Sequence, residues 1–146
     1  MTGIDEASAS HWEHFEHRAD MGIRGVGDTV AVAFQQAALA LTAVITDLSG
    51  VNPAEPVDIA CEAPDLEYLF VDWLNSLVFE MATRRMLFSR FEVEIRHTRL
   101  RARAWGEAVD VSRHHPTVEV KGATYTALRV AQEPSGRWIA QCVVDV

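Results

Sequence analysis

Cysteine is scarce in this sequence, since only Cys61 and Cys142 occur among 146 residues. Each lies in an apolar run typical of a strand, and the two are far apart in the chain. Two such cysteines build no disulfide framework, and without a Cys-x-x-Cys spacing they match no zinc or redox motif. We therefore predict two free, buried thiols in a protein of a reducing compartment.

Long apolar segments are missing as well. No stretch approaches the roughly 20 apolar residues that span a bilayer, and the N-terminus lacks the apolar core of a signal peptide. These absences predict a cytoplasmic protein with no membrane partner. The short, polar segment 1–10 is predicted to be a flexible leader, followed by a single domain over residues 11–146.

The common signatures of catalysis are absent too. The sequence contains no phosphate-binding loop, no Gly-x-Ser-x-Gly elbow, no Cys/His zinc spacing and no dinucleotide fingerprint. No nucleophile–base pair is recognisable either. We therefore predict that the protein is not an enzyme.

Acidic residues outnumber basic ones, giving a net charge of −8 and a pI near 5.1. An acidic surface repels phosphate backbones, so broad, sequence-independent binding to nucleic acid is not expected. Any role with tRNA or another RNA is then expected to be indirect, through a protein partner or a small local basic patch. The 49% content of hydrophobic residues is that of an ordinary globular domain.

Apolar residues recur every three or four positions in segments 30–45 and 66–81, which predicts two amphipathic helices. Capping residues precede each helix, Asp28-Thr29 and Pro64-Asp65 respectively. Period-two patterns predict strands at 11–17, 20–27, 57–62, 87–95, 100–107, 118–123, 125–131 and 138–145. This order predicts an α+β fold, with two helices packed on a mostly antiparallel, partly mixed β-sheet in a single compact domain. The last strand is apolar on both faces, so we expect it to be central.

Acidic groups interrupt apolar strands near both ends of the domain. Asp20 lies at the break between the first two strands, and Asp145 is followed by Val146 and its α-carboxylate. Neighbouring carboxylates repel each other unless they are solvated or neutralised. If the last strand lies beside the first ones, these three groups form a set of oxygen donors that suits Ca²⁺ or Mg²⁺. The alternative is a solvated strand terminus.

Histidines and isolated charged residues are weaker candidates for a functional site than the acidic groups. His14 and His17 are three residues apart and fall on opposite faces of a strand, which is poor geometry for a shared metal. Surface or interface positions are the expected alternative for these two and for the His114-His115 pair. Without further information, Lys121 and Glu107 are interpreted as solvent-exposed residues.

Taken together, these segments resemble the archease family. The first is Phe15-Glu16-His17-Arg18-Ala19-Asp20-Met21-Gly22-Ile23, where the family typically has Asp-His-Thr-Ala-Asp and an apolar run. Others follow in family order at 33–40, 46–48, 69–75, 105–107, 112–114, 120–125 and 144–146. The resemblance extends from about Trp12 to Val146, so residues 11–146 are identified as an archease-like domain.

The resemblance implies a function. Archeases are accessory proteins of the RNA-splicing ligase that joins tRNA halves, so we expect an activator that promotes ligase guanylylation and multiple turnover. Asp20, Asp145 and Val146 are carried over as ligands of a divalent metal ion, with calcium the expected ion. Candidate residues for partner contact or function are Lys121, Glu107 and His114.

Departures from the family pattern affect the same site. Glu16 replaces the usual Asp, and Arg18 replaces the usual Thr beside Asp20. A positive charge at Arg18 is expected to weaken metal affinity or to take the place of the metal as a counter-ion. Two alternative functions stay open, a metal-dependent hydrolase that uses Asp20, Asp145 and a histidine, and a chaperone-like modulator of an RNA-modifying enzyme.

Overall fold

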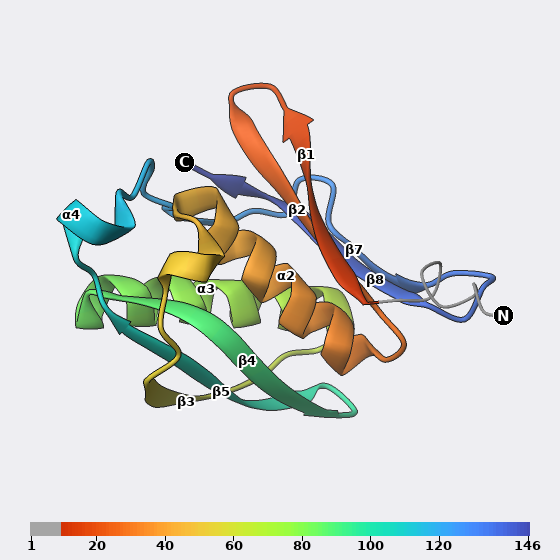
Figure 1. Cartoon of the computed structure of the whole chain (residues 1–146). Helices are drawn as coiled ribbons and strands as arrows, with labels where there is room; N and C mark the ends of the chain where they lie inside the picture. The colour runs from red at the N-terminus through yellow and green to blue at the C-terminus, as the bar shows by residue number, and fades with distance from the viewer. Residues whose placement is uncertain (1–9) are drawn as a thin grey trace, which may run out of the picture.

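A computed structural model describes residues 10–146. The flexible leader predicted for residues 1–10 therefore lies, apart from Ser10, outside the described residues. Two β-sheets enclose two long helices, which run between them (Figure 1). The α+β class predicted from the sequence is confirmed. None of the described helices is long and apolar enough to cross a membrane.

Both predicted long helices form, and each starts at a capping side chain. Thr29 accepts the N–H of Val32 at 3.1 Å, and Asp65 accepts the N–H of Tyr68 at 2.9 Å. Such caps satisfy backbone donors that the first turn leaves free. Two shorter helices lie in segments for which no helix or strand was predicted. The helices are α2 (Val30–Ile45), η1 (Leu48–Gly50), α3 (Leu66–Arg84) and α4 (Val111–His114).

The larger sheet has the strand order β1-β2-β8-β6, and β7 also pairs with β8. Strand β8 is therefore central, as its apolar faces predicted. The strand expected from residue 118 forms only at residues 122 and 123, and the preceding Thr117 donates its N–H to Ile45 of α2. The strands of this sheet are β1 (His11–His17), β2 (Asp20–Gly27), β6 (Gly122–Ala123), β7 (Arg129–Gln132) and β8 (Trp138–Asp145).

The smaller sheet has the strand order β3-β5-β4. Every strand pair in residues 10–146 is antiparallel. The single, partly mixed sheet of the prediction is thus replaced by two antiparallel sheets, since the helices separate the strands into two layers. The strands of the smaller sheet are β3 (Glu55–Glu62), β4 (Met86–Arg96) and β5 (Arg99–Ala108).

The core lies where α2 and α3 meet the two sheets. Trp73 is fully buried, and its indole N–H donates to the carbonyl of Phe34 at 3.1 Å. The rings of Phe34 and Phe70 pack edge to face with centroids 5.0 Å apart. Both cysteines are free, as predicted. Burial raises the pKa of the Cys142 thiol to about 12, so this thiol is unreactive at neutral pH.

Candidate functional site

Pairing of β2 with β8 brings Asp20 and Asp145 together. Met21 lies opposite Val144 in this pair, and the same register continued by one residue places Asp20 opposite Asp145. Residues directly opposite in an antiparallel pair project from the same face, with Cβ atoms about 5 Å apart. The N–H of Val146 donates to Oδ1 of Asp20 at 3.4 Å. All three predicted metal ligands therefore lie at one end of the larger sheet.

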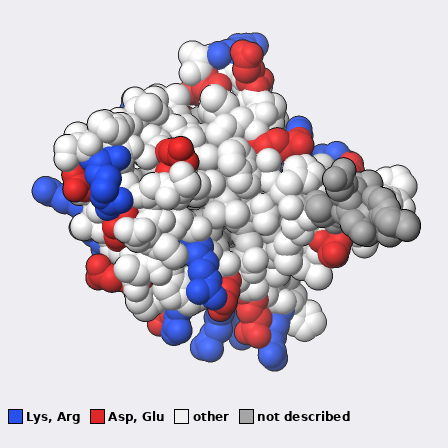
Figure 2. Space-filling view, viewed as in Figure 1, with Lys and Arg blue, Asp and Glu red and all other residues white. Residues whose placement is uncertain are grey.

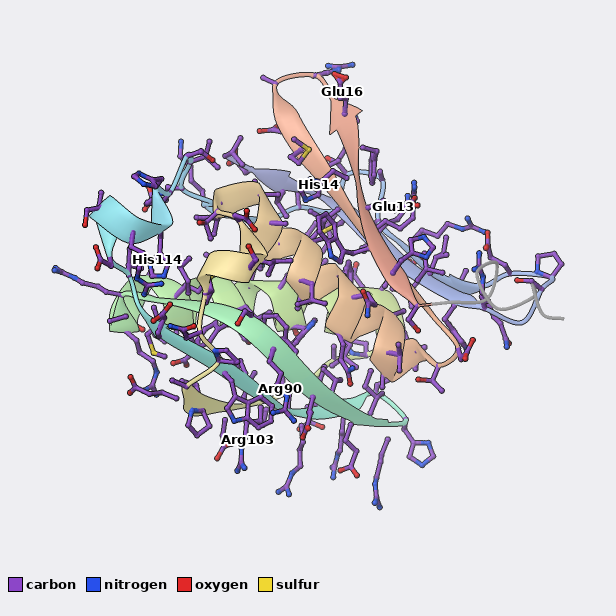
Figure 3. The ribbon with its side chains drawn as sticks, in the orientation of Figure 1. Glu13, His14, Glu16, Arg90, Arg103 and His114 are labelled. Carbon is purple, nitrogen blue, oxygen red and sulfur yellow. The ribbon has the colours of Figure 1, made fainter. Side chains whose placement is uncertain are left out.

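No basic side chain neutralises this pair of carboxylates within residues 10–146, where neither Asp20 nor Asp145 has an ion pair. Arg18 lies in the β1–β2 turn with φ 55 and is exposed, and within residues 10–146 it forms no ion pair with either carboxylate. Glu16 also lies at the outer end of this hairpin (Figure 3). Adjacent carboxylates without a counter-ion favour binding of a cation.

The available donors fit a hard divalent ion. The described part of the chain has no group of three or more His, Cys, Asp or Glu side chains placed to hold a metal. An ion at this end would therefore be held by two carboxylates, an oxygen of Val146 and water. This set contains only oxygen, the donor that Ca²⁺ and Mg²⁺ prefer, whereas zinc sites favour nitrogen and sulfur.

Lys121 lies beside the same carboxylates. Its backbone N–H donates to the carbonyl of Asp145 at 2.8 Å, and Gly122 is directly opposite Asp145. The Lys121 side chain is exposed. Asn75 of α3 supports this segment, because its Oδ1 accepts the N–H of Ala123 at 2.8 Å. The sequence placed Asn75 in a family segment but gave no sign of this contact, which joins residues 48 positions apart.

Glu107 and His114 also meet, in a cluster at the end of β5. His114 Nε2 lies 2.9 Å from Oε2 of Glu107, and the same oxygen accepts the N–H of Asn52 at 2.8 Å. Arg113 Nη2 lies 2.7 Å from the other carboxylate oxygen. The side chain of His114, the last residue of α4, is buried and lies below the helix in the view of Figure 3. Sequence reasoning missed Asn52 and Arg113, since no local pattern links them to Glu107.

The protonation states of this cluster follow from its contacts. The N–H of Asp110 donates to Nδ1 of His114 at 2.8 Å, so the ring proton is on Nε2 and is donated to Glu107. Hydrogen bonds from Arg113, then Asn52, then His114 lower the pKa of Glu107 to about 2. Glu107 is thus a carboxylate at neutral pH with its oxygens already engaged. The geometry makes the cluster an anchor for α4, and contact of either residue with a partner stays a prediction.

His14 lies in β1 and contacts helix α2. Its Nε2 lies 2.8 Å from the carbonyl oxygen of Ala40 on α2. His14 is opposite Ile23 whereas His17 is opposite Asp20, and their separation of three residues places them on opposite faces of β1. This arrangement gives no shared metal site, in agreement with the sequence reasoning.

Basic side chains gather on the outer face of the smaller sheet, among acidic ones (Figure 2). Arg90 and Arg103 project there, away from the helices (Figure 3). Ion pairs of 2.8–3.6 Å engage four of the five arginines, namely Arg90, Arg96, Arg99 and Arg103 but not Arg101. The local basic patch that the sequence left open is therefore largely balanced by carboxylates.

Comparisons with known proteins give similar sequences and similar structures over nearly the whole chain. Among curated relatives, protein archease of Pyrococcus abyssi is 40% identical over 92% of this chain and 98% of its own length. Protein archease of Methanopyrus kandleri is 42% identical over 92% and 99%. The solution structure of a Methanobacterium thermoautotrophicum protein has a TM-score of 0.81 at 32% identity, covering 92% of this chain and 98% of that one.

A more distant structure has the same fold. The crystal structure of an archease from Thermotoga maritima, described as a possible chaperone, has a TM-score of 0.60 at 16% identity and covers 90% of this chain and 94% of that one. The model of the Archease protein family matches residues 12–146. This chain belongs to the archease family.

Proposed function

We propose that this protein is a non-catalytic accessory protein of an RNA-splicing ligase, which promotes guanylylation and multiple turnover of the ligase. Membership of the archease family supports an accessory role. The observation that carries the proposal is the placement of Asp20 opposite Asp145, without a basic partner in residues 10–146. Such a pair at an exposed sheet end is suited to holding a cation where a partner can reach it.

Asp20, Asp145 and an oxygen of Val146 would hold the cation, with calcium the preferred candidate. Calcium takes about six to eight oxygen ligands, more than these residues supply. The remaining positions would be open to water or to groups of the ligase. When bound, a divalent cation supplies positive charge that neutralises phosphate oxygens during nucleotide transfer.

A calcium titration of the full chain, followed by calorimetry and by amide chemical shifts, tests the ligand set. We expect Asp20→Asn to weaken calcium binding by about tenfold or more, since it removes one of two carboxylates. Asp28→Asn is the matched control, because Asp28 is exposed and outside this end of the sheet. Wild-type protein that binds neither calcium nor magnesium would contradict the cation site while leaving the accessory role open.

A guanylylation assay of the cognate ligase, with and without this protein, tests the accessory role. Faster guanylylation and repeated turnover would support it. Hydrolysis of a phosphoester by the purified protein with metal would instead support a hydrolase. Recovery of an RNA methyltransferase, and no ligase, in a pull-down would support a chaperone-like modulator of RNA-modifying enzymes.

A further inference from the structure

Strand β3 forms one edge of the smaller sheet, because it pairs only with β5 among the described residues. One contact shows which of its backbone groups face β5. The N–H of Ala63 donates to the carbonyl of Thr98 at 3.2 Å, on the β5 side. In an antiparallel pair, residues two apart repeat the same pattern. Ile59 and Cys61 therefore direct their backbone groups toward β5.

The intervening residues direct their backbone groups to the open edge. These are Asp58, Ala60 and Glu62, all of which are exposed. Pro56 belongs to the same alternating set, and proline has no N–H to donate. Proline is tolerated on an edge strand only where its nitrogen faces away from the partner strand, which agrees with this assignment. The edge thus offers three backbone N–H groups to an incoming strand.

A groove of about 550 Å³ separates this edge from α3. Ala60 and Cys61 line it from β3, while Asp72, Asn75 and Phe79 line it from α3. Phe79 is 62% exposed, which is unusual for a large apolar side chain on a helix that packs on a sheet. The groove therefore combines open backbone donors with an exposed aromatic ring.

The charge of the groove is negative. Its lining contains three carboxylates and no lysine or arginine. Asp58 and Glu80 form ion pairs with Arg103 and Arg84, which lie outside the lining. Asp72 has no such pair within residues 10–146.

Asp72 faces β3 across the groove. Burial and then the charge of Asp72 raise the pKa of the Cys61 thiol to about 11, which reflects their proximity. An uncompensated carboxylate at this position attracts a basic side chain.

We propose that the open edge of β3 and the exposed face of α3 bind an extended, basic segment of a partner protein by strand addition. The backbone of the segment pairs with Asp58, Ala60 and Glu62. Because side chains alternate along a strand, every second side chain of the segment lies over the groove. Lysine or arginine there meets Asp72, and the aliphatic stems of these side chains pack on Phe79.

The groove is connected to the end of the larger sheet that carries Asp20 and Asp145. Asn75 lines the groove and also binds the N–H of Ala123, next to Gly122, which is opposite Asp145. Asn75 therefore links the groove to the segment that pairs with Asp145. The docking proposal itself depends only on β3 and α3 and does not require the partner to be a ligase.

Amide hydrogen exchange of the full chain, measured by NMR, tests this proposal. The probe is a capped synthetic peptide that alternates lysine and valine, and the control peptide alternates glutamate and valine. We expect the lysine peptide to slow exchange at Asp58, Ala60 and Glu62. The amides of Ile59 and Cys61 already pair with β5 and should change little. The glutamate peptide should give no protection.

Two test substitutions, and a matched control for one of them, sharpen the test. Ala60→Pro removes one edge N–H in the way that Pro56 already does, and Ala60→Val is the matched control that keeps it. We expect the proline variant to bind the lysine peptide about tenfold more weakly, for the loss of about one hydrogen bond and the clash of its ring with the added strand. Asp72→Asn leaves the backbone intact and should weaken binding and reduce its salt dependence.

Several results would overturn the proposal. These are equal binding of the lysine and glutamate peptides, unchanged binding by Ala60→Pro and Asp72→Asn, or no protection of the three edge amides. The proposal would also be overturned if these three amides were protected in the free protein and the protein sedimented as a dimer. That result would mean that a second copy of this chain, and not a basic segment, occupies the edge.

Discussion

Glu107 shows at the residue scale how a charged side chain near the surface can hold an element in place. Its carboxylate binds Arg113 and His114 of α4 together with the backbone of Asn52. These contacts lower the pKa of Glu107 from 4.5 to about 2 in the folded protein. The carboxylate therefore stabilises the fold above pH 4.5, and this contribution is lost as the pH falls from about 4.5 toward 2.

Replacement of Glu107 with glutamine should reveal this dependence. We expect Glu107→Gln to lower the free energy of unfolding by a constant amount between pH 5 and 7, because the wild-type carboxylate is fully ionised there. The difference should shrink between about pH 4.5 and 2, as the wild-type carboxylate takes up a proton. Urea unfolding at several pH values measures it. A difference that does not change with pH would contradict the assigned role.

At the scale of helices and strands, local sequence determines some parts of the fold and distant contacts determine others. The two long helices and the strands 20–27, 57–62 and 138–145 agree closely with their apolar periodicity, and Thr29 and Asp65 act as the helix caps. Periodicity was correct only in part for residues 118–131, where strands form at 122–123 and 129–132. Between and before these strands, Lys121 and Thr124 bind the backbone of β8, and Thr117, just outside this segment, binds α2. These distant partners, and not local preference, decide where strands form.

The candidate site likewise contains some residues that could be predicted from the sequence and others that could not. Asp20 and Asp145 were recognisable because each interrupts an apolar run, and their meeting depends only on the pairing of two strands. Asn52, Arg113 and Asn75 were not recognisable, because each contributes through a single long-range hydrogen bond. Helix α4 was not predicted, since four residues are too few to show a helical period.

Packing of α2 on β2 depends on a close approach at Gly25. A Cβ atom at this position would lie 2.0 Å from the carbonyl oxygen of Ala33 and 2.3 Å from the N atom of Ala37. Both are backbone atoms, so the helix would have to shift. We expect Gly25→Ala to lower the free energy of unfolding by about 2–3 kcal/mol.

Urea unfolding of Gly25→Ala beside a matched variant measures this effect. Gly50→Ala serves as the control, because a Cβ atom there would meet nothing within 4 Å. The control should change the free energy of unfolding by less than about 0.5 kcal/mol. Equal effects of the two substitutions would show that α2 does not approach β2 as closely as described.

The whole molecule carries a net charge of −8, and most arginines on the outer face of the smaller sheet are paired with carboxylates. Such a surface repels a phosphate backbone. We therefore expect the protein alone to produce no mobility shift of tRNA at about 0.15 M salt, the physiological ionic strength. A shift in the presence of the ligase only would agree with indirect contact. A salt-sensitive shift by the protein alone would contradict it.

The proposed role depends on the carboxylate pair at the end of the larger sheet. Asp145→Asn removes one charge and keeps the shape of the side chain, and Asp28→Asn makes the same change at an exposed position elsewhere. Circular dichroism of both variants should match that of the wild type, since neither residue lies in the core.

The most direct test is the rate of guanylylation of the cognate ligase with wild-type protein, Asp145→Asn and Asp28→Asn at equal concentrations. We predict that Asp28→Asn stimulates the ligase as fully as the wild type, whereas Asp145→Asn loses about tenfold or more of the stimulation. Full stimulation by a folded Asp145→Asn variant would contradict the proposal that these carboxylates act on the ligase.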